Sequence, residues 1–397
     1  MTRILVFVAV VLAIAVGIHY YLWARLVRDP HLPSPWREIA ASALVVLAAG
    51  MPLAMVVGRK HVAAGRVLAW PAFIWMGLMF LLLTTLVATD LARLVLSFVG
   101  RASGMPSHPE RRTAIARLVA SAVTALSGGL AIAAFRSARG PIAVQRVNVE
   151  LARLPATRNG FRIVQLTDIH VGSTIGRAFV EEIVRRANAL DPDLIAVTGD
   201  LVDGSVSDLR DAVAPLGALR ARHGVYFVSG NHEYFSGAEP WFEELTRLGV
   251  RVLRNERVTI GEDADGFDLA GIDDHSAERF SGVPHAVALE RALGGRDASR
   301  EVVLLAHQPR SFLDAERFAI GLQLSGHTHG GQMWPFGVFV RMSQPFVAGL
   351  HRRRDAQIYV SRGTGYWGPP MRLGAPAEIT ELVLRRAPLS TPSPRAT

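Results

Sequence analysis

Four long apolar stretches constrain the fold of this 397-residue chain more than any other feature. Each has about 20 residues, the length that an α-helix needs to cross the hydrocarbon core of a bilayer. The stretches are Ile4–Trp23, Ile39–Gly58, Leu68–Thr89 and Ala114–Phe135. A single stretch could be a signal peptide or a buried helix of a soluble domain. Four in succession, with arginine-containing loops between them, predict a multi-pass membrane region over residues 1–140.

The orientation of these spans depends on the charge of their loops. Basic residues in short loops favour the cytoplasmic side, but their number is equal on the two sides of the predicted membrane, so the count leaves the side undecided. The loop Gly58–Arg66 is short and dense in charge, and it favours the cytoplasm for the rest of the chain. We therefore expect an integral protein of a bacterial cell membrane with a slight preference for that orientation.

Composition narrows the range of cofactors and partners. The chain contains no cysteine, which excludes disulfides and thiolate metal sites. Its formal net charge is +9, and most of the basic residues are arginine. Because many of these arginines flank apolar segments, we expect an anionic lipid surface as the partner and no nucleic acid.

From Pro141 the sequence alternates between short apolar runs and amphipathic stretches, which predicts an α/β domain over residues 141–386. The predicted strands are Phe161–Thr167, Asp193–Thr198, Val225–Ser229, Phe267–Ile272, Val302–Ala306, Gly321–Leu324 and Gln357–Ser361. The predicted helices are Arg177–Leu190, Asp208–Arg222, Glu239–Leu248 and Pro284–Leu293. Residues 387–397 are rich in Pro, Ser and Thr and are predicted to be disordered.

Polar signatures follow five of these predicted strands. They are Asp168-Ile169-His170, Gly199-Asp200, Gly230-Asn231-His232-Glu233, Ala306-His307 and Gly326-His327-Thr328-His329. Asp168 and His170 are two residues apart, so on an extended strand they would point the same way. The set offers carboxylate, amide and imidazole ligands, a mixture that suits Mn, Fe or Zn better than Mg or Ca.

Each signature alone has an ordinary explanation, such as a turn or a helix cap. Their joint occurrence beside predicted strands indicates a centre for two divalent metals, with Asp200 able to bridge both. Two ions about 3.5–4 Å apart hold a water as hydroxide and neutralise phosphoryl oxygens during in-line displacement at phosphorus. His232 is then available as a general acid for the leaving alkoxide, with Asn231 beside it.

The order of these signatures resembles that of the calcineurin-like metallophosphoesterases, over roughly Phe161 to Leu384. Further matching stretches are Thr198–Gly204, Gly271–Asp274, Gly326–Gln332, Arg362–Gly365 and Met371–Gly374, and they point to the branch with N-terminal membrane helices. The resemblance implies a four-layer α/β/β/α sandwich after the transmembrane region. It also implies that Asp168, His170 and His329 hold one metal, that Asn231, His307 and His327 hold the other, that Asp200 bridges them, and that His232 serves the transition state.

Three further residues have two readings each. Asp203 and Glu233 either orient metal ligands, a usual role for carboxylates behind a metal site, or are a turn residue and a helix-start residue. Arg372 lies in a Gly/Pro-rich stretch with Tyr366 and Trp367. That stretch either forms a substrate wall, with the arginine on a second phosphate or a lipid headgroup, or is a packed loop.

The sequence therefore predicts a membrane-anchored dinuclear-metal phosphohydrolase that cleaves a phosphoester or pyrophosphate bond, with a lipid-linked substrate as one candidate. A phosphodiesterase or phosphatase for soluble substrates is the alternative. A membrane transport protein with a regulatory metal-binding domain is disfavoured, because His19, Asp90 and Arg117 are almost the only ionisable residues in the spans. A metal-dependent scaffold would not need His232. Natural substrate, metal and oligomeric state stay open at this point.

Overall fold

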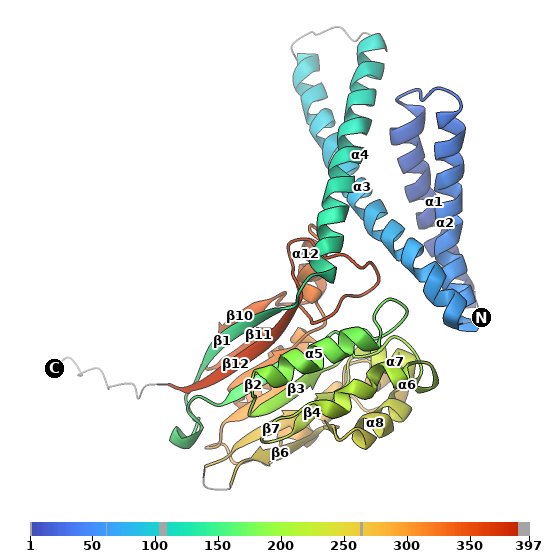
Figure 1. The fold of residues 1–397 in the computed structure, drawn as a ribbon. Helices are drawn as coiled ribbons and strands as arrows, with labels where there is room; N and C mark the ends of the chain where they lie inside the picture. Colours follow the sequence, from blue (N-terminus) through green and yellow to red (C-terminus); the bar gives the residue numbers. More distant parts are fainter. Residues whose placement is uncertain (1, 61, 103–108, 263–264, 388–397) are drawn as a thin grey trace, which may run out of the picture. The chain divides into compact units, whose positions relative to one another are not determined.

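The computed structural model describes residues 2–60, 62–102, 109–262 and 265–387. The chain divides into two compact units, one helical and one α/β (Figure 1). The helical unit comprises Met1–Arg139 together with Gly368–Met371, and the α/β unit comprises Gly140–Trp367 together with Arg372–Thr397. Most of the predicted disordered tail, residues 388–397, lies outside the described residues.

Each predicted span lies within one long helix of the helical unit. The helices are α1 (Thr2–Trp23), continued by a π-helical segment at Ala24–Arg28, α2 (Trp36–Lys60), α3 (Val62–Ala102) and α4 (Pro109–Arg139). All four are long and apolar enough to cross a membrane. Among the described side chains, Val45, Val46 and Leu118 are largely exposed on their outer faces, as expected for helices whose solvent is lipid.

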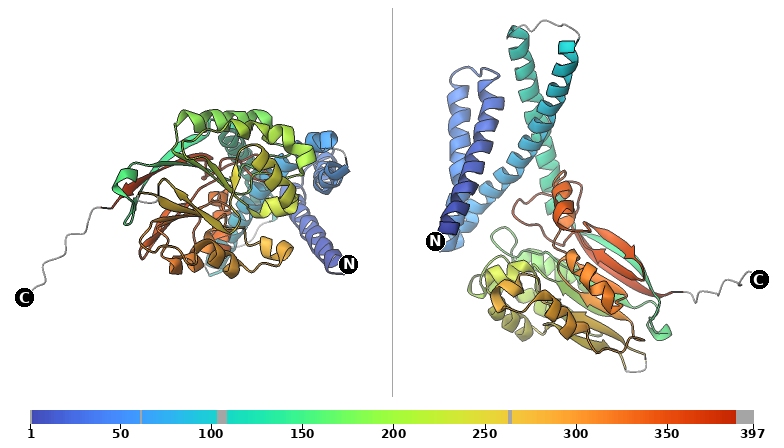
Figure 2. Two further views of the ribbon diagram at one scale, coloured as in Figure 1. Left: turned by 90° about the horizontal axis from the view of Figure 1, so that it is seen from below. Right: turned by 180° about the vertical axis from the view of Figure 1, so that it is seen from behind.

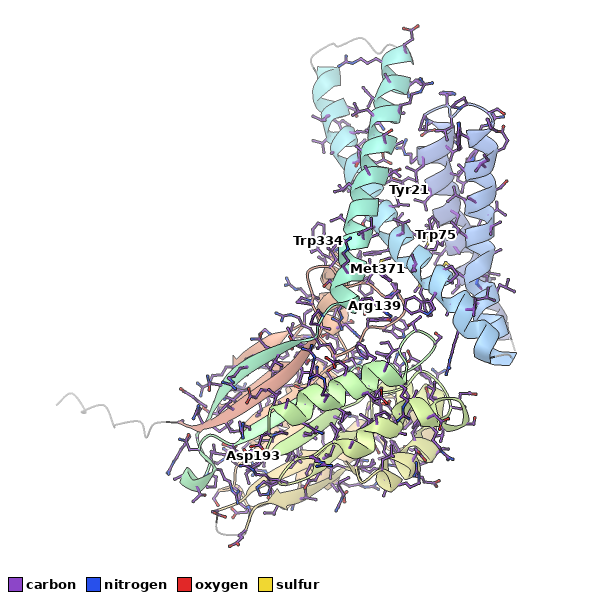
Figure 3. All side chains as sticks on the ribbon, in the orientation of Figure 1. Tyr21, Trp75, Arg139, Asp193, Trp334 and Met371 are labelled. Carbon is purple, nitrogen blue, oxygen red and sulfur yellow. The ribbon has the colours of Figure 1, made fainter. Side chains whose placement is uncertain are left out.

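Polar side chains inside the helical unit have partners. The Asp90 carboxylate accepts hydrogen bonds from the Tyr21 hydroxyl at 2.6 Å and from Arg25 Nε at 2.9 Å. His19 Nε2 accepts from Trp75 Nε1 at 3.1 Å, and both Tyr21 and Trp75 are marked in Figure 3. Arg117 Nε donates to a backbone carbonyl. These paired groups hold helices together, which fits an anchor better than a transport pathway.

The described strands of the α/β unit form two six-stranded mixed sheets. The first has the order β1-β12-β2-β3-β4-β5 and the second β10-β11-β9-β8-β7-β6. The strands are β1 (Ala143–Leu151), β2 (Arg162–Leu166), β3 (Leu194–Thr198), β4 (Val225–Val228), β5 (Arg251–Val252), β6 (Glu256–Ile260), β7 (Phe267–Gly271), β8 (Val302–Leu305), β9 (Leu322–Ser325), β10 (Gly349–Arg353), β11 (Ala356–Val360) and β12 (Glu378–Arg386).

The two sheets pack face to face, with helices on their outer faces (Figure 2, left). Side chains alternate along β8: Val303 and Leu305 belong to the core between the sheets, whereas Val302 and Leu304 belong to the core beneath the outer helices. The helices are α5 (Arg177–Ala189), α6 (Val206–Val213), α7 (Asn231–Ser236), α8 (Ala238–Arg247), α9 (Ala277–Ser281), α10 (His285–Leu293), α11 (Phe312–Ala315) and α12 (Gly337–Ser343). The expected α/β/β/α layering is confirmed.

The predicted strands all exist, and their observed ends differ from the predicted ends by at most one residue. The predicted helix Asp208–Arg222 is too long, because α6 ends at Val213 and a 3₁₀ turn containing Pro215 follows. Proline lacks the N–H that would continue the α-helix. The sequence analysis also missed β1 and β12, which pair with each other in parallel along their full length.

We expect the α/β unit to fold without the helical unit, because their hydrophobic clusters share no residue in the described part of the chain. A protein truncated to residues 140–397 should be soluble without detergent and should unfold in one cooperative thermal transition. The full-length protein, which should require detergent, is the control. An aggregated fragment without cooperative unfolding would contradict this expectation.

Candidate metal centre

The signature residues gather because the strands that precede them end at the same edges of the two sheets. Strands β2, β3 and β4 run parallel in one sheet, and β7, β8 and β9 run parallel in the other. The residues that follow their carboxyl ends are Asp168 and His170 after β2, Asp200 after β3, Asn231 and His232 after β4, His307 after β8, and His327 and His329 after β9. Polar residues in such loops are the usual site-forming residues of α/β folds.

Five of these residues have a left-handed backbone conformation. The φ angles are 52° at Asp168, 56° at His170, 52° at Asp200, 71° at His327 and 50° at His329. The expectation that Asp168 and His170 lie on an extended strand is therefore wrong, because β2 ends at Leu166, but both side chains join the same ligand group. Residues other than glycine rarely adopt positive φ, and their concentration here marks a functional site.

Two glycines allow the ligand loops to approach one another. Gly199 has a φ of 86°, and a Cβ there would lie 2.5 Å from the backbone nitrogen of Gly230. A Cβ on Gly326 would collide with the side chains of Thr167 and Asp168. Glycine is therefore required in the Gly199-Asp200 and Gly326-His327 signatures because a larger side chain would collide with the neighbouring loop.

The first ligand group consists of Asp168, His170 and His329, all buried. His170 Nε2 lies 3.1 Å from His329 Nε2, and His329 Nε2 lies 3.4 Å from Asp168 Oδ1. The Asp168 carboxylate also accepts hydrogen bonds from the backbone N–H of His327 and from the Thr167 hydroxyl, which fix its orientation.

The second ligand group consists of Asp200, His307 and His327. His307 Nε2 lies 3.1 Å from Asp200 Oδ2 and 3.3 Å from His327 Nδ1. His307 Nδ1 lies 2.8 Å from the Thr198 carbonyl oxygen, so it carries the proton and leaves Nε2 free to bind a metal. The Asn231 Oδ1 atom is buried and has no hydrogen-bond partner.

These distances fit two metal ions. Ligand atoms about 2.1 Å from one metal lie about 3.0–3.4 Å apart in tetrahedral or octahedral geometry, which is the separation found within each group. Asp200 Oδ2 also lies 3.9 Å from His170 Nε2, so it faces both groups. A buried amide oxygen without a partner, as at Asn231, is explained if it binds a metal. The donor set again suits Mn, Fe or Zn.

Glu233 connects two of the ligand loops. Its carboxylate is fully buried and accepts backbone hydrogen bonds from Gly230, Asp200 and Leu201 at 2.6, 3.0 and 2.8 Å. Burial raises the pKa of Glu233 to about 7, and the nearby charge of Asp200 acts in the same direction. Glu233 lies in the first turn of helix α7, and it also holds the Asp200 loop through hydrogen bonds. Both roles considered for it in the sequence analysis therefore apply.

Asp203 orients two imidazole rings. Its Oδ1 lies 2.6 Å from His232 Nδ1 and 3.1 Å from His170 Nδ1. His232 Nε2 then lies 4.0 Å from Asp200 Oδ2, at the side of the ligand groups. Burial acts to lower the pKa of His232, but the carboxylates of Asp203 and Asp200 outweigh it and raise the pKa to about 9.

The Arg372 side chain points into the protein and is not available to a substrate at the surface. The side chain is fully buried, and its nitrogen atoms donate to the backbone carbonyls of Gly365 and Ala375 and lie 3.3 Å from His329 Nδ1. This arrangement matches the packed-loop reading and leaves the guanidinium bonded to protein acceptors. Burial lowers the pKa of Arg372 to about 10.

The two aromatic residues of the same stretch differ in their surroundings. Tyr366 is buried, with its hydroxyl on a backbone carbonyl, whereas Trp367 is 54% exposed. The centroid of the Trp367 ring lies 5.5 Å from that of the His232 ring. The Phe235 ring also contacts His232, with its centroid 5.7 Å away. Gln332 holds Trp367 through two hydrogen bonds to its backbone. The sequence analysis missed Phe235 and Gln332, although both lie within three residues of a metal-ligand motif.

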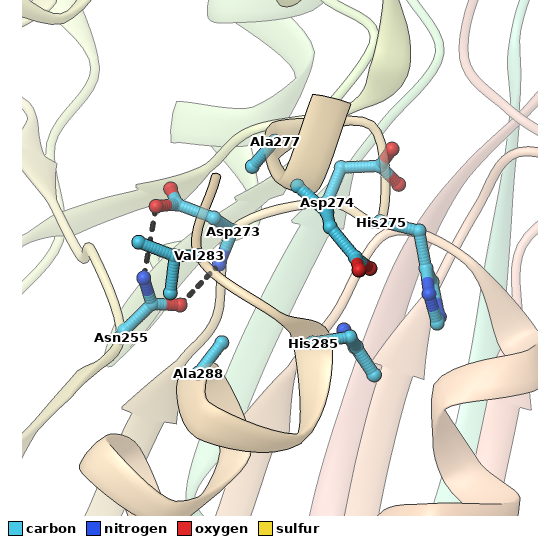
Figure 4. Close-up of a pocket in the computed structure, with 9 residues that line it drawn as sticks. Asn255, Asp273, Asp274, His275, Ala277, Val283, His285 and Ala288 are labelled. Carbon is cyan, nitrogen blue, oxygen red and sulfur yellow. Dashed lines mark hydrogen bonds between the residues drawn. The ribbon is translucent and has the colours of Figure 1, made fainter. Parts of the chain in front are cut away.

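A small cavity near His307 holds polar residues that the motifs do not explain (Figure 4). Asp273 and Asn255 exchange two hydrogen bonds at its wall. The rings of His275 and His285 stack with centroids 3.6 Å apart. Among the described residues this cluster does not bring three ligand atoms together as the ligand groups do. We therefore assign no metal to it.

The ligand geometry predicts two metal ions for each chain. A cobalt titration followed by visible absorption should saturate at two equivalents in the wild-type protein. Loss of a residue that only hydrogen-bonds a metal ligand lowers metal affinity roughly 10–100-fold. Asp200→Asn should lower cobalt affinity at both positions by more than that, because Asp200 is proposed to be a ligand of both metals. Asp193→Asn is the matched control, because Asp193 bonds Arg222 and the Arg162 backbone at the far end of β3 (Figure 3). Unchanged cobalt affinity in Asp200→Asn would contradict the assignment.

The chain is similar to several known proteins. The calcineurin-like phosphoesterase family matches residues 161–331. A bovine "transmembrane protein with metallophosphoesterase domain" is 44% identical over 73% of this chain, and the match spans just under two thirds of that relative, 66%. An uncharacterized metallophosphoesterase of Campylobacter jejuni is 30% identical over 96% of this chain and 98% of its own length. A dimetal phosphatase structure from Danio rerio aligns with a TM-score of 0.35 at 13% identity, over 52% of this chain and 88% of that one. With its motifs in place and a relative matched along nearly its whole length, the chain belongs to the calcineurin-like phosphoesterase family.

Proposed function

We propose that this protein is a membrane-anchored hydrolase that cleaves a phosphoester or pyrophosphate bond at a pair of divalent transition metals. The observation that carries the proposal is the pair of ligand groups that meet at Asp200 Oδ2, with His232 beside them. When bound, two such metals neutralise phosphoryl oxygens and lower the pKa of a water nucleophile. Asp168, His170, His329 and Asp200 would hold one metal, and Asn231, His307, His327 and Asp200 the other.

The chain itself supplies the proton that the leaving group needs. Asp203 accepts the Nδ1 proton of His232, so Nε2 is the atom that faces the ligand groups. A proton held at Nε2 can pass to the leaving oxygen as the bond to phosphorus breaks. The helix-starting loop at Gly230 fixes the His232 backbone, whose N–H donates to Asp200 Oδ1 at 2.9 Å.

This role predicts that His232→Ala slows turnover by about 10²–10⁴-fold while two metals remain bound. The loss should shrink for substrates whose leaving group has a low pKa, such as nitrophenol, since such a group needs no proton. Asp203→Asn should give a smaller loss with the same leaving-group trend, because the amide oxygen can still accept the Nδ1 proton but the charge that raises the pKa of His232 is gone. Loss of metal from His232→Ala would show that this histidine is a ligand instead.

We further propose that the leaving group is apolar, which favours a lipid-linked substrate over a soluble one. The proposal rests on the side chains that contact the proposed acid: Phe235 and Trp367 both pack on His232 and are 63% and 54% exposed. Phe280 extends this surface through its contacts with Phe235 and Tyr234. A leaving alcohol that takes its proton from His232 must lie against these rings.

An apolar leaving-group subsite predicts that kcat/KM rises with the alkyl length of the leaving alcohol in a series of soluble phosphoesters. The rise should approach about fourfold for each methylene group buried, the equivalent of about 0.8 kcal/mol. Trp367→Ala should flatten this dependence with little change for the shortest alcohol. Leu313→Ala is the control, because Leu313 is an exposed apolar residue on α11 with no part in either apolar surface. A length dependence that is equally steep in Trp367→Ala would contradict the subsite and favour a soluble, polar substrate.

We propose the cytoplasmic side of the membrane for the α/β unit, on the basis of the basic residues Arg59, Lys60 and Arg66 between the second and third predicted spans.

A further inference from the structure

A second apolar surface lies on the segment that follows the metal ligand His329. We call it the α12 patch, and it consists of Trp334, Phe336, Val338, Phe339 and Met342. These side chains are between 47% and 83% exposed, and none of the seven residues of α12 is buried. Five large apolar side chains within nine residues exceed the scattered exposure that is normal for a soluble surface.

The local structure holds this patch outward. Before α12, Met333 forms a bridge with Leu373, and the Trp334 N–H donates to the Leu373 carbonyl at 2.9 Å. After α12, the buried Gln344 accepts a hydrogen bond from the Arg310 backbone N–H at 3.2 Å. Because the segment is fixed at both ends, its exposed apolar side chains are part of a built surface.

The charged residues of this segment are all basic, and two of them, Arg353 and Arg354, pair with Glu316 of another segment. The segment from Gln332 to Arg354 contains no Asp or Glu and has four arginines. One of these, Arg341, lies on α12 itself and is exposed, and the other three are exposed at Arg352–Arg354. A surface that joins Trp, Phe and Met with arginine matches the boundary of an anionic bilayer, where aromatic rings lie at the headgroups and arginine reaches phosphate.

The chain keeps a bilayer within reach of the patch. Helix α4 ends at Arg139 and β1 begins at Ala143, so only three residues separate a candidate span from the α/β unit. An extended connection of that length covers about 14 Å at most. The start of β1 is therefore tethered near the end of a candidate span, and contact with lipid is an intramolecular event for the α/β unit.

We propose that the α12 patch inserts into the headgroup region of an anionic bilayer and forms a second membrane contact of this protein, in addition to its spanning helices. Phe339, Val338 and Met342 would lie at the acyl boundary, Trp334 at the headgroups, and Arg341 on lipid phosphate. The occupant of the patch is lipid, and neither a second copy of the chain nor another protein is required.

Because the natural chain has no cysteine, single cysteines can report on this contact in the full-length protein. Met342→Cys, labelled with an environment-sensitive fluorophore, would be compared in nanodiscs of phosphatidylcholine with and without phosphatidylglycerol. Glu243→Cys on α8 is the matched exposed control. We expect a blue-shifted emission at position 342, several-fold less quenching by aqueous iodide than at position 243, and quenching by spin labels carried on lipid acyl chains.

Three results would overturn the proposal. In the first, the label at position 342 is as accessible to iodide as the control. In the second, its protection persists in detergent and grows with protein concentration, which would assign the patch to a second copy. In the third, Arg341→Gln and Phe339→Asp leave the depth of the label unchanged. None of these readouts requires turnover, so they stay separate from the test of hydrolysis, for which soluble phosphoesters are the substrates.

Discussion

The buried carboxylate of Asp200 is the constraint on which the rest of the α/β unit depends. A carboxylate removed from water must be paired with donors or positive charge. Burial acts to raise the pKa of Asp200, but the imidazole of His307 outweighs it and holds the pKa well below its usual range. At the neighbouring Asp168, also fully buried, burial prevails and the pKa is raised. The two carboxylates thus compete for the same positive charge, and the site is built for more cationic charge than its side chains provide.

The loops around Asp200 accept unfavourable conformations to bring the ligands together. Left-handed φ values outside glycine cost about 1–3 kcal/mol each, and Asp168, His170 and Asp200 all have them. Hydrogen bonds within the site offset this cost. Glu233 accepts the N–H groups of the Asp200 loop, and the Asp168 carboxylate accepts that of His327. Unfavourable backbone conformations and the hydrogen bonds that offset them are therefore located in and beside the ligand groups.

The ligand set could be predicted from the sequence because the fold places every motif by the same rule. A short apolar run becomes a buried strand, parallel strands end at one edge, and the polar residues that follow them meet there. The direction of each side chain could not be predicted, since Asp168 and His170 have left-handed backbones whose N–H groups donate to the carbonyls of Gly199 and Asp200, about 30 residues away in the sequence. Strand β1 was missed for a related reason: it is an edge strand whose outer residues are mostly exposed, so its sequence lacks a continuous apolar signal.

Arg372 and Trp367 illustrate how far a motif can mislead about neighbouring residues. Both belong to one Gly/Pro-rich stretch, and a basic residue there suggested contact with phosphate. In the structure the charged residue is buried on backbone carbonyls behind His329, and the apolar one is exposed beside His232. Burial of an arginine requires that its donors be satisfied, and carbonyls freed by irregular backbone provide the acceptors. A loop without regular backbone hydrogen bonds offers free carbonyl groups, and the Arg372 guanidinium is buried because it donates to them. No local sequence pattern predicts this.

Several of the exposed apolar side chains of the α/β unit follow a ligand motif closely in the sequence. Phe235 follows Asn231 in helix α7, and Trp334 and Phe339 follow His329. Water penalises each of these exposed surfaces by roughly 25 cal/mol for each Å² that could otherwise be buried. A site for a small soluble phosphate would gain nothing from that cost. At a membrane surface the penalty disappears, because the acyl chains of lipid cover the same side chains. Under the function that we propose, the scissile bond would lie among the ligand groups while the exposed apolar side chains face the bilayer.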